Sequence, residues 1–134
     1  MVMLAQQRLT GCLADRGADE EDIVRLEHVL GVTLPASYRR FMLVSDGCDG
    51  TTGTLWIVLY PISEVAERTK QFEKVVGLRD VVQIGTDGGL EAYVIDYSPD
   101  GPRFGAIPFV GDGLADLAWS SPTLDDLVEA LGRI

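Results

Sequence analysis

Residues 34–47 read Leu-Pro-Ala-Ser-Tyr-Arg-Arg-Phe-Met-Leu-Val-Ser-Asp-Gly, and this stretch predicts one short, well-buried helix. Pro35 suits the first helical turn, because that position needs no N–H donor and the fixed φ of proline is already helical. Ala36 and Arg40 are expected to point away from the core, and Gly47 can supply the left-handed residue that closes the helix. The bulky residues recur at spacings of three and four and form one stripe: Leu34, Tyr38, Phe41, Met42 and Ser45, widened by Leu43 and Val44. We therefore expect a helix packed between two layers, with Tyr38 and Phe41 as core anchors.

Two further helices are expected on the N-terminal side of this stretch. Apolar spacing between Val2 and Leu13 predicts an amphipathic helix, which the Thr10-Gly11 pair weakens. A better helix is predicted from Asp19, because acidic residues fill its first turn, where the helix dipole favours negative charge. Gly31 ends this second helix. Its core stripe is Ile23, Leu26 and Leu30.

The residues that follow the central stretch alternate between loop, strand and helix. Residues 48–53 are rich in Gly, Asp and Thr, which predicts a loop. Residues 54–60 read as a strand that Pro61 stops. Residues 62–76 return to helical spacing, with Ser63 as the expected cap and Gly77 as the end.

From Val81 onward the apolar period becomes that of strands. Strands are expected over residues 81–85, 90–97 and 105–110, and the alternation in the middle strand predicts burial on both faces. Thr123 and Asp126 then predict the capped start of a last helix that faces the sheet. The predicted fold is α+β, in a single domain over residues 1–134. Its antiparallel β-sheet meander packs with the N-terminal helices, the Leu-Pro-started helix and the C-terminal helix.

The order of these motifs resembles the SUKH superfamily. The resemblance rests on an acidic helix ending at glycine, on Leu-Pro-x-x-Tyr-x-x-Phe followed by Asp-Gly, and on three later segments. These segments are Ile84 to Gly89 and Tyr93 to Asp96, which are similar to the central hairpin of the superfamily, and Thr123 to Leu127, which resembles its last helix. The matches cover about residues 23–131. One departure is Leu90, where members often carry a third glycine.

The resemblance implies a non-enzymatic protein-binding module. Within the superfamily, the implied role is that of a cytoplasmic immunity protein that binds and neutralises a bacterial toxin domain. The superfamily also includes fungal Smi/Knr-type regulators of cell-wall synthesis, so a regulatory interaction protein is the alternative. A toxin gene beside this one would separate the two roles.

Charge and composition exclude several other classes. The chain has 11 basic and 21 acidic residues and a formal charge of -10, which repels a nucleic-acid backbone. No apolar run approaches a membrane span, and residues 1–13 lack the apolar core of a signal peptide. We therefore expect a cytoplasmic protein that binds neither nucleic acid nor membrane. Cys12 and Cys48 are expected to stay reduced there.

Candidate catalytic residues are few. His28 and Cys48 are a conceivable base and nucleophile, but nothing in the sequence orients them, and His28 is expected to be an ordinary surface histidine. Asp87, Glu91 and Asp96 offer paired carboxylates, as hydrolases need. However, Asp87 is explained by its turn, and the other two are separated by an odd number of positions, which places them on opposite faces of a strand.

A calcium site is also unsupported, because the loop beginning at Asp46 and Asp49 has Ile57 where the twelfth position requires glutamate. No catalytic residue, cofactor or metal is therefore expected. An uncharacterised enzyme that uses the carboxylates or Cys48 stays an open alternative.

The partner implied by the acidic charge is a basic toxin domain, such as a nuclease. Five acids fall in predicted turns: Asp46, Asp49, Asp87, Asp100 and Asp112. We select Asp46, Asp49 and Asp87 as partner-binding residues, because the central hairpin and the end of the Leu-Pro helix are expected to lie near each other. The alternative is that these acids only keep the protein soluble.

Overall fold

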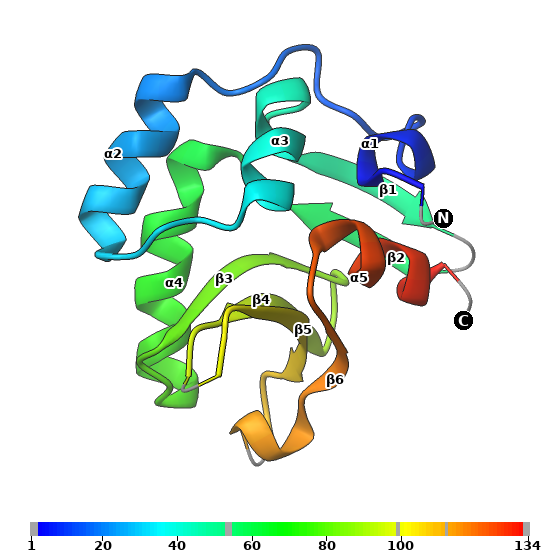
Figure 1. Ribbon diagram of the computed structural model, residues 1–134. Coiled ribbons are helices and arrows are strands. Elements are labelled where there is room, and N and C mark those ends of the chain that lie inside the picture. The colour runs from blue at the N-terminus through cyan, green and yellow to red at the C-terminus, as the bar shows by residue number, and fades with distance from the viewer. Residues whose placement is uncertain (1–2, 53–54, 99, 112, 133–134) are drawn as a thin grey trace.

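An antiparallel sheet forms the centre of the computed structural model, which describes residues 3–52, 55–98, 100–111 and 113–132 (Figure 1). Within these ranges the sheet has six strands in the order β1-β2-β3-β4-β5-β6. The strands are β1 (Cys48–Thr52), β2 (Leu55–Leu59), β3 (Val81–Thr86), β4 (Glu91–Asp96), β5 (Arg103–Pro108) and β6 (Ala118–Ser121). The helices are α1 (Ala5–Arg8), α2 (Glu20–Leu30), α3 (Ala36–Val44), α4 (Ile62–Val76) and α5 (Leu124–Leu131), with a 3-10 turn η1 (Gly113–Asp116). The predicted α+β class is confirmed.

Both faces of the sheet are covered, but unequally. The larger apolar cluster joins α3 and α5 to one face, through residues such as Phe41, Leu127 and Ile95. Figure 1 shows α2 and α4 packed against each other beside the sheet. The smaller cluster lies on the other face and contains Phe72 of α4 together with Val81, Ala92, Val94 and Ile107 of β3–β5. The prediction that the middle strand is buried on both faces is therefore confirmed for β4.

The helix that begins after Pro35 lies in the core as predicted. Tyr38, Phe41 and Met42 are fully buried. Leu43 and Val44 are 44% and 47% exposed, so the prediction that they widen the buried stripe is wrong. They follow Met42 directly, and the 100° step per residue carries them around to the solvent side of the helix.

Gly47 does not close α3, contrary to the prediction. The helix ends at Val44, and Ser45 caps it in an extended conformation. Gly47 lies beyond this cap with φ 89°, and a Cβ built on it would lie 2.5 Å from the backbone oxygen of Leu59. A glycine is therefore needed at residue 47 because the backbone of β2 approaches closely.

Arg40 is exposed, as predicted, and its side chain also contacts another helix. Its guanidinium forms an ion pair with Asp125 on α5, 2.5 Å away. The same carboxylate accepts a hydrogen bond from the backbone N–H of Ala5, at 2.6 Å. Asp125 therefore joins α1, α3 and α5 through one buried side chain.

The largest error of the sequence analysis concerns residues 48–53, which were expected to form a loop. Residues 48–52 form β1, which pairs with β2 from Cys48 opposite Leu59 to Thr52 opposite Leu55. Glycine and aspartate have weak local preference for a strand, but a full set of cross-strand pairs outweighs that preference.

Other boundaries also shift. The N-terminal helix is a single turn, α1, after which Leu13 forms a bridge with Cys48. β5 begins at Arg103, two residues before the predicted start. β6 had no counterpart in the prediction. In contrast, the predicted helix ends at Gly31 and Gly77 are confirmed, as is the cap at Thr123, whose hydroxyl accepts from Asp126 N.

None of the helices in the described part of the chain is long and apolar enough to cross a membrane.

Candidate functional site

Two of the three predicted partner-binding acids lie two strand positions apart, Asp49 on β1 and Asp87 in the turn that follows β3. Asp49 on β1 pairs with Val58 on β2, and Val58 pairs with Thr86 on β3, directly before Asp87. Two strand spacings amount to about 10 Å, so the carboxylates of Asp49 and Asp87 belong to the same end of the sheet. The side chain of Asp49 is exposed and makes no hydrogen bond or ion pair to any residue that the structure describes.

Asp46 has a different environment. Its side chain is half-buried, and its Oδ1 accepts a hydrogen bond from the backbone N–H of Ile62 at 2.7 Å. Ile62 is the first residue of α4, where backbone N–H groups have no partner inside the helix. Asp46 therefore caps α4 from a distant part of the chain. Ser63, the predicted cap, does not do so, because Pro61 occupies the N-cap position.

This contact leads to a stability prediction. Replacing Asp46 by alanine is expected to lower the free energy of unfolding by about 1 to 2 kcal/mol, because the N–H of Ile62 loses its acceptor. Replacing Asp49 by alanine is the matched control and should change it by less than about 0.5 kcal/mol. Urea unfolding followed by circular dichroism measures both. Equal effects of the two substitutions would contradict the capping role.

Asp46 and Asp49 line the same groove, which we call the Tyr60 groove. It has a volume of about 580 Å³ and lies between the N-terminal segment, the β1–β2 hairpin and the start of α4. Its lining includes Cys12, Asp46, Asp49, Tyr60, Glu64 and Arg68. The guanidinium of Arg68 lies 4.7 Å from the centre of the Tyr60 ring and 3.4 Å from a carboxylate oxygen of Glu64. Because this cation already has partners inside the groove, the net field toward solvent is negative.

Asp87 shapes the turn between β3 and β4. Its Oδ1 accepts from the N–H groups of Gly89, at 2.8 Å, and Glu91, at 3.2 Å. The prediction that Asp87 is explained by its turn is therefore confirmed. Burial, and then the neighbouring charge of Asp87, raise the pKa of Glu91 above its usual value. These bonds hold the turn in a fixed shape.

The surface that carries Asp49 and Trp56 was not predicted from the sequence. Opposite residues in antiparallel strands share a face, so Asp49, Val58, Thr86 and Ala92 lie on the face that carries the smaller apolar cluster. That cluster covers only β3–β5, and on β2 the side chain of Trp56 remains 47% exposed. We call this surface the Trp56 face and define it as Asp49, Thr51, Trp56 and Val58 together with the turn from Gly88 to Leu90. The sequence feature that could have indicated this surface was an aromatic residue, Trp56, at a strand position that faces away from the larger apolar cluster.

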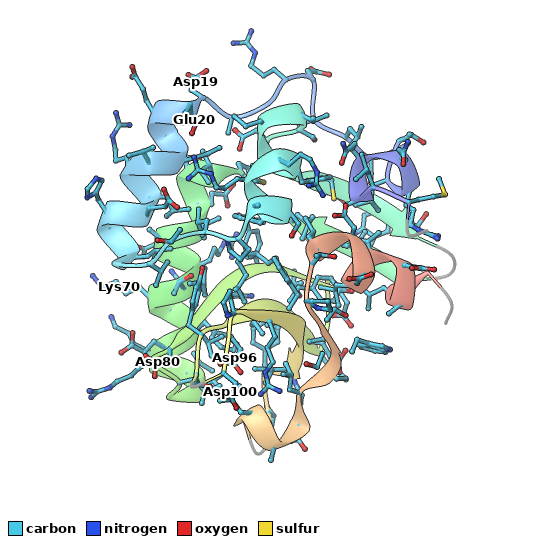
Figure 2. The ribbon with its side chains drawn as sticks, viewed as in Figure 1. Asp19, Glu20, Lys70, Asp80, Asp96 and Asp100 are labelled. Carbon is cyan, nitrogen blue, oxygen red and sulfur yellow. The ribbon has the colours of Figure 1, made fainter. Side chains whose placement is uncertain are left out.

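The remaining predicted acids lie elsewhere. Asp100 is exposed in the connection after β4, at the opposite end of that strand from the Asp87 turn (Figure 2). Asp112 lies outside the described residues. Asp96, also labelled in Figure 2, is fully buried and bonds to Ser98 and Arg103. Asp96 and Glu91 are separated by an odd number of positions on β4 and lie on opposite faces of this strand, as predicted.

The candidate nucleophile and base do not meet. His28 is exposed on α2 and lines a hollow with Glu27 and Arg39, whereas Cys48 lines the Tyr60 groove. Burial raises the pKa of Cys48 far above its usual range and also raises that of Cys12, so both thiols stay protonated at neutral pH. In the described ranges no group of three or more His, Cys, Asp or Glu side chains is arranged to hold a metal ion.

Cys12 and Cys48 lie close together, because Leu13 bridges to Cys48 and Asp49 N donates to Cys12 O at 3.1 Å. Both cysteines are free. We predict that they stay unbridged when thiols are trapped at extraction, because few thiolates form and the thiolate is the reactive species. Mass spectrometry without reductant measures this. A mass two daltons below the reduced value would contradict the prediction.

One sequence comparison identifies relatives of the chain. The model of the SMI1/KNR4 family (SUKH-1) matches residues 17–130, from the start of α2 into α5. The match includes each motif on which the resemblance to the SUKH superfamily was based, and it confirms that resemblance. No curated protein matches the chain significantly.

Proposed function

The chain belongs to the SMI1/KNR4 family (SUKH-1), and from this membership we propose that it is a cytoplasmic immunity protein that neutralises a bacterial toxin domain. The family is known for toxin immunity proteins, is generally non-catalytic and acts through protein–protein interaction. In this proposal residues 1–134 act as one binding domain without chemistry of their own. The separation of His28 from Cys48 and the raised pKa values of both thiols support a non-enzymatic role.

The observation that carries the proposal is the Trp56 face. It combines an exposed aromatic side chain with the exposed carboxylate of Asp49, on a chain with a formal charge of -10. Buried aromatic anchors ringed by polar groups are typical of protein interfaces. The partner we propose is therefore a toxin domain with a basic surface, such as a nuclease.

A regulatory interaction protein of the Smi/Knr kind is the second candidate, because the matching family is the one named for those proteins. The two candidates predict different gene neighbourhoods. An immunity protein should be encoded beside a toxin gene, and co-expression with that toxin should restore growth. Growth arrest that persists despite co-expression of the folded protein would contradict the immunity role.

The contribution of charge is tested by the rate of association with that toxin domain. We expect the rate to fall as ionic strength rises, because the Debye length shrinks from about 30 Å at 0.01 M salt to about 8 Å at physiological salt. Asp49→Lys should lower the rate at low salt, since the Asp49 side chain makes no hydrogen bond to any described residue that its loss would break.

Glu73→Lys is the matched control, because it makes the same change of net charge on an exposed position of α4 outside the Trp56 face. We expect its effect on the rate to be smaller than that of Asp49→Lys. A rate that responds neither to salt nor to Asp49→Lys would mean that the acids serve solubility alone.

A further inference from the structure

The indole of Trp56 is held in place although it is exposed. The turn backbone packs against its edge, since a Cβ built on Gly88 would lie 3.1 Å from Trp56 Cδ1. The hydroxyl of Tyr93 donates to the backbone oxygen of Trp56 at 3.3 Å. Gly88 has φ 81°, a conformation that glycine adopts without strain, so this close approach depends on glycine. Trp56 therefore offers a preformed aromatic surface to a partner.

A carboxylate flanks this indole on one side. Thr51 lies opposite Trp56, and Asp49 is two residues from Thr51 on the same face, a diagonal neighbour at about 7 to 8 Å. On the other side lies the turn backbone at Gly88. Asp87 precedes Gly88, but it pairs with Glu91, because Asp87 N donates to Glu91 O, and it therefore belongs to the opposite face of the sheet. The Trp56 face itself, as defined above, contains no lysine or arginine.

We propose that the Trp56 face binds an arginine side chain of a basic protein partner, an inference that rests on the proposed function. The guanidinium stacks on the indole and donates hydrogen bonds to the carboxylate of Asp49. A planar, weakly hydrated guanidinium can do both at once, whereas a compact, strongly hydrated ammonium can make the charge contact but stacks less well.

The chain itself contains a similar arrangement of an arginine, an aromatic ring and a carboxylate. In the Tyr60 groove, Arg68 stacks over the Tyr60 ring and pairs with Glu64. The Trp56 face has the aromatic ring and, in Asp49, the carboxylate of that arrangement but lacks the arginine, which the partner would supply. Leu90, 81% exposed, lies opposite Phe109, because Phe109 N donates to Leu90 O, and Val110, 91% exposed, follows Phe109 in the chain. They provide apolar contact at the rim.

The first test uses capped hexa-arginine and hexa-lysine peptides as probes at low salt. The indole N–H resonances of the two tryptophans are followed by nitrogen-15 NMR, with Trp56→Phe to assign Trp56 and Trp119 as the internal reference. We expect hexa-arginine to shift the Trp56 resonance at about tenfold lower concentration than hexa-lysine, since cation–π stacking differs between the two. Asp49→Asn should weaken the arginine response, and Glu73→Gln should not.

Equal responses to the two peptides would overturn the proposal, as would peptide binding that leaves the Trp56 resonance unmoved. The structure predicts that Trp56→Ala stays folded, because the indole is 47% exposed and the hydrogen bond from Tyr93 goes to the backbone oxygen of Trp56, which alanine retains. Its melting temperature checks this. Trp56→Phe is the second variant and should retain part of the stacking.

A second test separates the failure of this inference from the failure of the proposed function. Under the proposed immunity function, Trp56→Ala should raise the Kd for the toxin domain by about 30-fold, which is the effect expected for truncating a hot-spot residue of an interface. An unchanged Kd in Trp56→Ala, with binding lost in Asp49→Lys, would overturn arginine stacking while supporting the immunity role. Selective binding of hexa-arginine at Trp56, without rescue from any adjacent toxin, would support the stacking and overturn the immunity role.

Discussion

Replacing Phe41 by alanine is expected to lower the free energy of unfolding by about 3 to 5 kcal/mol. The side chain of Phe41 is fully buried in α3, in the larger apolar cluster between that helix, α5 and the sheet. Truncation removes the ring from this cluster and leaves a cavity that the surrounding backbone cannot fill. A domain of this size has a total stability of about 5 to 15 kcal/mol, so the variant should be close to unfolding.

Thermal and urea unfolding of Phe41→Ala measure this effect. Leu43→Ala is the matched control on the same helix, because Leu43 is 44% exposed and its truncation should cost less than about 1 kcal/mol. A Phe41→Ala protein with the melting temperature of the original chain would contradict the placement of α3 in the core.

The second large effect is expected at Asp96. Its fully buried carboxylate accepts from Ser98 N at 3.0 Å, from Ser98 Oγ at 2.6 Å and from Arg103 Nε at 2.8 Å. Asp96→Asn keeps the shape but removes the charge that strengthens these bonds, so it should lower the free energy of unfolding by about 2 to 3 kcal/mol. Urea unfolding at neutral pH measures the difference.

The same substitution predicts a pH dependence. Burial alone would raise the pKa of Asp96, but the hydrogen bonds from Ser98 and the charge of Arg103 outweigh burial and lower that pKa. A carboxyl with a lowered folded pKa stabilises the fold above its unfolded value, about 3.9 for aspartate, and loses this stabilisation as pH falls through the folded pKa. The stability gap between the original chain and Asp96→Asn should therefore narrow below about pH 4.

The control for this pH series is Asp100→Asn, which alters an exposed acid in the same connection and should leave the pH dependence unchanged. A gap for Asp96→Asn that stays constant from neutral pH to about pH 3 would show that the charge of Asp96 does not stabilise the fold.

Residues with unusual backbone preferences, proline and glycine, explain why several helix ends were predicted well from the sequence. Proline and glycine restrict or free φ without reference to the rest of the chain, so the start of α3 near Pro35 and the ends of α2 and α4 at Gly31 and Gly77 were predictable. Thr123 caps α5 through a contact three residues away, which is also local. Errors appeared where the deciding contact is distant, as at Ser63, which Asp46 replaces as the acceptor at the start of α4.

The predictions about the candidate site also succeeded where the deciding contact is local and failed where it is distant. The sequence predicted acids in turns, and it correctly explained Asp87 by its own turn. It did not distinguish Asp46, which is used by the fold, from Asp49, which is free among the described residues, because that difference depends on α4. It also passed over Trp56, because whether a strand residue is covered depends on which helix packs over that part of the sheet.

Taken alone, the amino-acid sequence determined the α+β class, most helix ends, the two-sided burial of β4 and the family of this protein. Periodicity and backbone restriction act over a few residues, and motif order survives without coordinates. Only the tertiary structure decided that residues 48–52 form an edge strand, that Asp46 caps a helix and that Trp56 lies exposed on the same face as Asp49. Each of these depends on contacts between residues distant in the chain, and a local pattern contains no information about which distant residues meet.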